Sequence, residues 1–70
     1  MRVSARNLIK GKVTQIEQGA VNSVVTLEIP GGAELVSVIT VSSVERLGLD
    51  VGKEAYAMIK ASNVMIAVED

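Results

Sequence analysis

The chain has 70 residues, 49% of them apolar, with a mean hydropathy of +0.40 and a formal net charge of −1. It contains no cysteine and no histidine, which excludes disulfides and the usual zinc ligands as stabilising cross-links. The slightly acidic balance argues against a general nucleic-acid surface, and no apolar run approaches the roughly 20 residues of a membrane-spanning helix.

Small size makes self-association the expected route to stability. A chain of this length buries only roughly 60–65% of its unfolded surface, and its single Tyr and lack of Trp and Phe leave the core to aliphatic residues. Apolar surface left over from one small core would suit subunit interfaces. We therefore expect a single domain over residues 1–70 that forms a homo-oligomer. The absence of an apolar run after Met1-Arg2 indicates no signal peptide, so a cytoplasmic location is expected.

The alternation of apolar and polar residues predicts five strands, at residues 3–18, 20–29, 33–41, 54–60 and 64–68. Gly11, inside the first strand, indicates a bend or bulge of the kind that tight barrels need. Pro30-Gly31-Gly32 predicts a turn, because proline fixes φ and glycine permits positive φ. The third strand is apolar on both faces, so one face would line a barrel and the other would meet a partner subunit.

A short helix is predicted between the third and fourth strands. Ser42-Ser43-Val44-Glu45 matches a capping box, in which the first serine accepts from a first-turn amide and the glutamate reaches back to the cap. Gly48 is the natural residue to end the helix, and Val44 and Leu47 would plug one end of the barrel. The predicted fold is therefore all-β, a five-stranded barrel of the oligonucleotide/oligosaccharide-binding (OB) type with one short helix between the third and fourth strands.

Two polar segments, Ser4-Ala5-Arg6-Asn7 and Lys60-Ala61-Ser62-Asn63, offer hydrogen-bond donors and contain no acid. A barrel that brings them together would hold an anion, with the charge-assisted bonds of the arginine and the lysine as the strong ones. Thr40 and Ser43, near the predicted helix start, would add hydroxyls, backbone amides and the positive end of the helix dipole. The sequence thus predicts an oxyanion site that includes Ser4, Arg6, Thr40, Ser43, Lys60 and Ser62.

Each of these residues also has an ordinary structural interpretation. Polar residues are common at strand ends, Thr40 is a good strand former, and the Lys60 side chain could extend along a barrel rim. Arg6 is the hardest to explain in this way, because it lies between small residues just ahead of an apolar strand.

Other classes of function have less support. Without His or Cys there is no obvious catalytic base or nucleophile, so we expect no enzyme activity, no cofactor and no bound metal cation. An OB-type nucleic-acid face needs aromatic rings along a basic groove, and Tyr56 is the only ring. A structural assembly module and a weak nucleic-acid binder remain as alternatives.

The chain resembles the molbindins, small molybdate-binding proteins whose Mop domain also occurs in molybdate-responsive regulators and transport ATPases. The resemblance covers the whole chain and is carried by Ser4-Ala5-Arg6-Asn7 with Lys10-Gly11, by Ile39-Thr40 ahead of Val44-Glu45-Arg46-Leu47-Gly48, and by Ile59-Lys60-Ala61-Ser62.

This resemblance implies a hexamer built as a trimer of dimers, with molybdate or tungstate held in pockets between subunits for intracellular storage or buffering. One subunit would contribute Ser4, Ala5 and Arg6 to each pocket. The neighbouring subunit would contribute Thr40, Ser43, Lys60 and Ala61.

Overall fold

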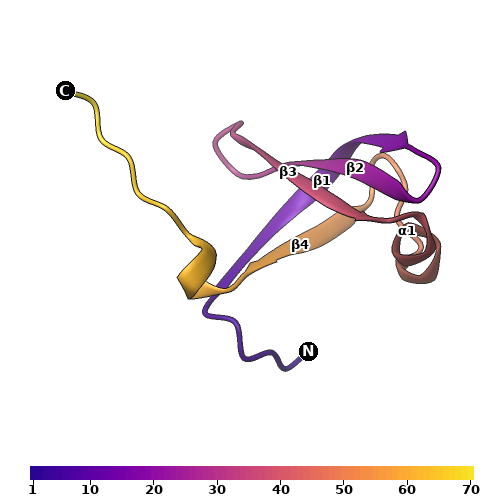
Figure 1. Cartoon of the computed structure of the whole chain (residues 1–70), viewed down its shortest axis with the longest axis horizontal. Coiled ribbons are helices and arrows are strands. Elements are labelled where there is room, and N and C mark those ends of the chain that lie inside the picture. Colours follow the sequence, from indigo (N-terminus) through magenta and orange to yellow (C-terminus); the bar gives the residue numbers. More distant parts are fainter.

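The computed structural model describes residues 1–70 as a curled antiparallel sheet with one short helix (Figure 1). The elements in chain order are β1 (Asn7–Gln18), β2 (Asn22–Glu28), β3 (Glu34–Thr40), α1 (Val41–Leu47), β4 (Glu54–Ile59) and the 3-10 helix η1 (Ala61–Asn63). The strand order in the sheet is β3-β2-β1-β4, so β3 and β4 form its two edges. Neither α1 nor η1 has the length and apolar character that a membrane-spanning helix requires.

Strands β1 and β2 are the inner strands of the sheet, because each pairs with two partners. The first half of β1 pairs with β4, from Asn7 opposite Ile59 onward, and its second half pairs with β2. Residues 3–6, predicted as part of this strand, precede it, since its pairing with β4 begins only at Asn7.

The irregularity of β1 lies between Val13 and Gln15, not at Gly11. Gly11 is buried where the strands approach closely, and a Cβ added there would lie 2.8 Å from the carbonyl oxygen of Glu28. The glycine therefore permits close backbone approach, while the bulge supplies the change of register.

The core is small. Val13, Val25 and Leu27 are its buried hydrophobic residues, and only 5 of the 70 residues are buried. Val44 packs against this core from α1, as predicted, but Leu47 is 61% exposed and does not plug the end of the sheet. A single chain thus leaves much of its apolar surface in contact with water.

The cap of α1 is Thr40, which corrects the predicted capping box of Ser42 with Glu45. Thr40 Oγ1 accepts a hydrogen bond from the backbone N–H of Ser43 at 3.0 Å and donates one to Ser43 Oγ at 2.8 Å. Thr40 is paired with Asn22 at the end of β3, which holds it extended, so the helix can begin at the next residue. Gly48 ends the helix with φ of 63°, as predicted.

We expect Thr40→Ala to lower the free energy of unfolding by about 0.5–2 kcal/mol, because the first turn loses its side-chain acceptor. Ser42→Ala is the matched control and should change the stability little. Urea unfolding without oxyanion, at one fixed protein concentration, measures both. Equal losses at the two positions would contradict the assignment of the cap to Thr40.

The predicted fifth strand is wrong for the single chain. After η1, residues 64–70 run outward from the body of the molecule without secondary structure (Figure 1). Met65 is 93% exposed, Ile66 85% and Val68 84%. The apolar run has the composition of a strand, but a strand forms only where a neighbour satisfies its backbone groups.

Candidate functional site

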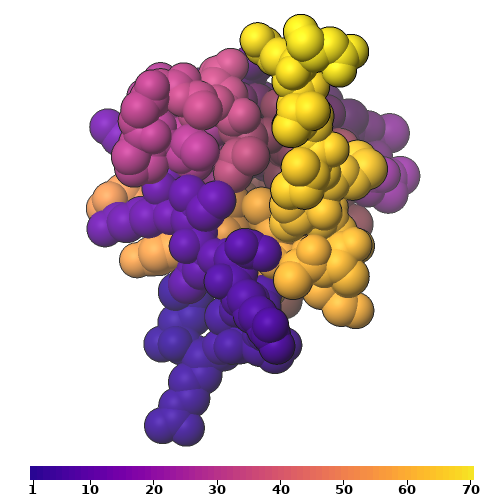
Figure 2. Space-filling model, turned by 90° about the vertical axis from the view of Figure 1, so that its left-hand side faces the viewer, coloured from indigo at the N-terminus to yellow at the C-terminus, as the bar shows by residue number.

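The start of β1 and the end of β4 bring the two polar segments together. Asn7 pairs with Ile59, and its side-chain Nδ2 donates to the carbonyl oxygen of Ile59 at 3.2 Å. The chain before β1 and the chain after β4 therefore leave the sheet at the same point. Figure 2 shows that they then diverge, the N-terminal segment downward and the C-terminal segment upward. They line an open hollow whose walls are Val3, Ser4, Ala5, Arg6, Met58, Lys60, Ala61, Ser62 and Asn63.

The hollow is rich in donors and has no acid among its lining residues. Arg6 and Lys60 supply two exposed cationic groups, while Ser4 and Ser62 supply hydroxyls. Neither cation is engaged with a carboxylate in the chain. Such a set of groups can bind an anion by several hydrogen bonds at once, two of them charge-assisted.

The 3-10 helix η1 adds backbone groups to this wall. It begins directly after Lys60, and no side chain caps it. The N–H groups of Ala61 and Ser62 therefore have no partner within the turn. These amides extend the donor set beyond the side chains.

Lys10, a cation further along β1, is already engaged. Its Nζ lies 3.1 Å from Oε2 of Glu54, in the only ion pair of the chain. The hydrogen bond to Glu54, together with the negative charge of that carboxylate, raises the pKa of Lys10. Lys10 therefore differs from Arg6 and Lys60, whose charges are not balanced by an acid.

Thr40 and Ser43 do not line the hollow. Thr40 is paired with Asn22, close to the far end of β1, whereas the hollow lies where β1 begins. The hydroxyls of Thr40 and Ser43 bond to each other at the start of α1. One chain therefore brings six predicted residues together and leaves these two apart.

Within one chain, Lys60 and Ala61 lie beside Arg6 and not beside Thr40. The grouping across subunits that the resemblance implies stays a prediction. Three lining residues, Val3, Met58 and Asn63, are absent from the predicted set. Met58 could have been found, because residues two apart on a strand share a face and Met58 precedes Lys60 by two positions.

Comparisons with known proteins agree on the family. Residues 3–66 match the family model of the TOBE domain. A probable molybdenum-pterin-binding protein of Haemophilus influenzae is 54% identical over 69 residues, which cover 99% of this chain and 100% of the relative. The solved structure of MopII from Clostridium pasteurianum has a TM-score of 0.91 at 45% identity and covers 96% of this chain and 100% of that one. The cytoplasmic molybdate-binding protein ModG, solved with molybdate bound, has a TM-score of 0.89 at 52% identity, over 93% of this chain and 46% of that one.

The fold and the donor-rich hollow define a small β-domain suited to anions. The chain belongs to the TOBE domain family and, within it, to the molbindin (Mop) proteins, which confirms the resemblance seen in its sequence.

Proposed function

We propose that the protein binds molybdate in the hollow between residues 3–6 and 60–63 and serves as a cytoplasmic store or buffer for this oxyanion. The observation that carries the proposal is the convergence of Arg6 and Lys60 with two serine hydroxyls in a hollow without an acid. A tetrahedral oxyanion that carries no proton needs donors only, so this set matches it. The description of ModG as a cytoplasmic molybdate-binding protein supports the same ligand and location.

A binding role without catalysis fits the residues present. The chain has no histidine and no cysteine, and the similar proteins are named for what they bind. The residues that line the hollow include no histidine and no carboxylate that could activate a serine hydroxyl. We therefore propose that the protein binds and releases molybdate without changing it chemically.

A second copy would complete the site. In one chain the hollow is open and its charged side chains are exposed, whereas hydrogen bonds to an ion gain strength when water is excluded. Thr40 and Ser43 of a neighbouring subunit would add hydroxyls on the open side. Val36 and Val38 are 67% and 64% exposed, which suits an assembled form. We propose the hexamer, a trimer of dimers, as that form.

The name of the Haemophilus influenzae relative raises a pterin as an alternative ligand. A pterin is a flat ring system that would gain affinity by stacking on an aromatic side chain. The hollow has no aromatic residue, and Tyr56, the only one in the chain, is not among its walls. The free oxyanion fits the residues better.

Isothermal titration with molybdate tests the proposal. A saturable binding curve is expected, and tungstate, which has the same shape and charge, should compete for the same sites. A flat titration would indicate a purely structural assembly module. A gel shift with single-stranded nucleic acid, combined with a flat molybdate titration, would indicate a nucleic-acid binder.

Phosphate is expected to compete poorly with molybdate. Near neutral pH phosphate still carries an O–H donor, and the hollow has few acceptors and no carboxylate. An unpaired buried donor costs about 1–3 kcal/mol, which is about five-fold to more than one hundred-fold in affinity.

Competition titrations with molybdate-loaded protein measure this discrimination. Sulfate is the control, because it is a dianion without a proton and can be rejected only by its smaller size. Displacement of molybdate by phosphate at comparable concentration would contradict a site built from donors.

A further inference from the structure

Met58 is the only sulfur-containing side chain among the residues that line the hollow. It lies on β4 two residues before Lys60, and it pairs with Leu8 of β1. It is 58% exposed, so small reagents in solution can reach its thioether. A peroxide converts such a thioether, which is apolar and flexible, into a polar sulfoxide, and the conversion is reversible. The wall of the hollow therefore contains one group whose polarity can be changed and restored.

The surroundings of Met58 give this change a consequence. Arg6 and Lys60 line the same hollow, and neither is paired with an acid of the chain. A thioether is only a weak hydrogen-bond acceptor, so it leaves the donors of both cations to a bound anion. The S–O group of a sulfoxide is polar, with its negative end on the oxygen. Oxidation of Met58 thus brings an acceptor into a hollow built from donors.

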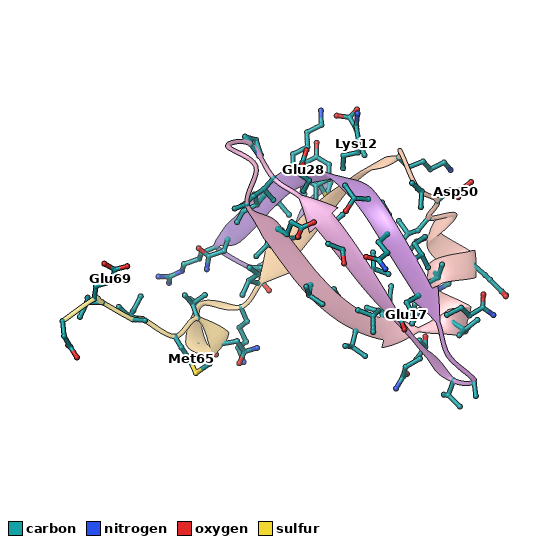
Figure 3. The ribbon with its side chains drawn as sticks, turned by 90° about the horizontal axis from the view of Figure 1, so that it is seen from above. Lys12, Glu17, Glu28, Asp50, Met65 and Glu69 are labelled. Carbon is teal, nitrogen blue, oxygen red and sulfur yellow. The ribbon has the colours of Figure 1, made fainter.

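The other two methionines lack these surroundings. Met1 is 82% exposed and Met65 is 93% exposed, and neither lines the hollow. Figure 3 shows Met65 on the segment that extends away from the sheet. A peroxide would oxidise both without placing an oxygen beside Arg6 or Lys60. Location, rather than exposure, therefore distinguishes Met58.

We propose that Met58 is a site of reversible oxidation by hydroperoxides, and that its sulfoxide oxygen accepts hydrogen bonds from Arg6 or Lys60 and so weakens oxyanion binding. This inference rests on the proposed function of the hollow. The oxidised protein releases molybdate that the reduced protein holds.

The oxidation step needs only the peroxide as co-reactant. The sulfur attacks one oxygen of hydrogen peroxide, and the S–O bond forms as the O–O bond breaks. The proton of the transferred oxygen passes to the departing hydroxide, which leaves as water. The sulfur loses the two electrons that the peroxide gains. A thiol-dependent methionine sulfoxide reductase reverses the change.

Hydrogen peroxide can reach Met58 by the path that the oxyanion takes. In one chain the hollow is open. In the proposed assembly a neighbouring subunit closes part of it, but a path that admits a tetrahedral oxyanion also admits the smaller peroxide molecule. Assembly therefore leaves the thioether within reach of the oxidant.

Titration of peroxide-treated protein with molybdate tests the proposal. Three full-length proteins are compared, namely the parent, Met58→Leu and Met65→Leu. Leucine is apolar and close to methionine in volume, so it preserves the packing and cannot form a sulfoxide. Each protein is treated with hydrogen peroxide, the peroxide is removed with catalase, and the oxidised positions are found by peptide mass. Each treated sample is compared with its own untreated sample.

We expect treatment to weaken molybdate binding by the parent and by Met65→Leu about ten-fold, the factor that corresponds to losing one hydrogen bond to a charged group. Treatment should leave the affinity of Met58→Leu unchanged, and incubation with a sulfoxide reductase should restore the parent. Sedimentation should show the same oligomeric size before and after treatment.

Three results would overturn the proposal: full affinity in a parent protein whose Met58 is oxidised, an equal loss in Met58→Leu, or dissociation of the treated parent into smaller species. Absence of a sulfoxide at Met58 when Met65 is fully oxidised would also overturn it. Failure of the proposed function is distinguishable, because it gives a flat titration before treatment, whereas failure of this inference gives an unchanged binding curve after it.

Discussion

Replacing Arg6 or Lys60 by alanine is expected to weaken molybdate binding about ten-fold or more. Each side chain brings a positive charge to the hollow, and neither is neutralised by an acid of the chain. A hydrogen bond to a charged group contributes about 1.5–3 kcal/mol, and about 1.4 kcal/mol corresponds to a factor of ten in affinity. Isothermal titration of the two variants against the parent protein measures the loss.

Lys12→Ala is the matched control for these substitutions. Lys12 is an exposed lysine of β1 that lies outside the walls of the hollow (Figure 3). Lys10 would be a poor control, because it is paired with Glu54 and its loss would also remove an ion pair. Equal small effects at Arg6, Lys60 and Lys12 would contradict the assignment of the site.

Arg6→Lys separates charge from geometry. A lysine keeps the positive charge but cannot donate two parallel hydrogen bonds to an oxyanion. If the guanidinium binds two oxygens at once, Arg6→Lys should recover only part of the affinity lost in Arg6→Ala. Full recovery would show that the position supplies charge alone.

Features set by local backbone chemistry could be predicted from the sequence. The turn at Gly31 and Gly32 has φ of 96° and 91°, and Gly48 has φ of 63°, all in the region that favours glycine. The four strands of the sheet also lie where alternation of apolar residues places them. In each case the determinant is a residue and its immediate neighbours.

Features set by pairing between distant segments were harder to predict. The capping box at Ser42 is a valid local pattern, but the pairing of Thr40 with Asn22 fixes the end of β3 and moves the cap to Thr40. Gly11 suggested a bend, yet the bulge follows Val13, where the register with β2 changes. Local patterns list the possible structures, and long-range pairing selects among them.

The candidate site also combines features that follow from the sequence with features that depend on contacts between distant segments. Arg6 and Lys60 share one hollow because Asn7 pairs with Ile59, a contact that follows from adjacent antiparallel strands. Thr40 and Ser43 lie at the other end of β1, so only a second chain could bring them to the hollow. A sequence shows which residues can bind an anion but not which copy of the chain supplies each of them.

Molybdate is expected to stabilise the assembled protein by about 2.7 kcal/mol per site when its free concentration is one hundred times the dissociation constant. The stabilisation follows from mass action if the complete site exists only in the assembly. The melting temperature should therefore rise with molybdate concentration. Tungstate should act in the same way, and phosphate at equal concentration should have much less effect.

The positive charges of the ligand-free site strengthen the coupling between molybdate binding and assembly. Without an anion, Arg6 and Lys60 face the same hollow with no counter-charge, and closing it with a second subunit would bring these like charges into a drier environment. A dianion replaces that repulsion with attraction. Diluting the protein should therefore dissociate the ligand-free form at a higher concentration than the molybdate-bound form. Sedimentation at matched low concentrations, with and without molybdate, measures the difference, and a monomer that binds molybdate with full affinity would show that the site lies within one chain.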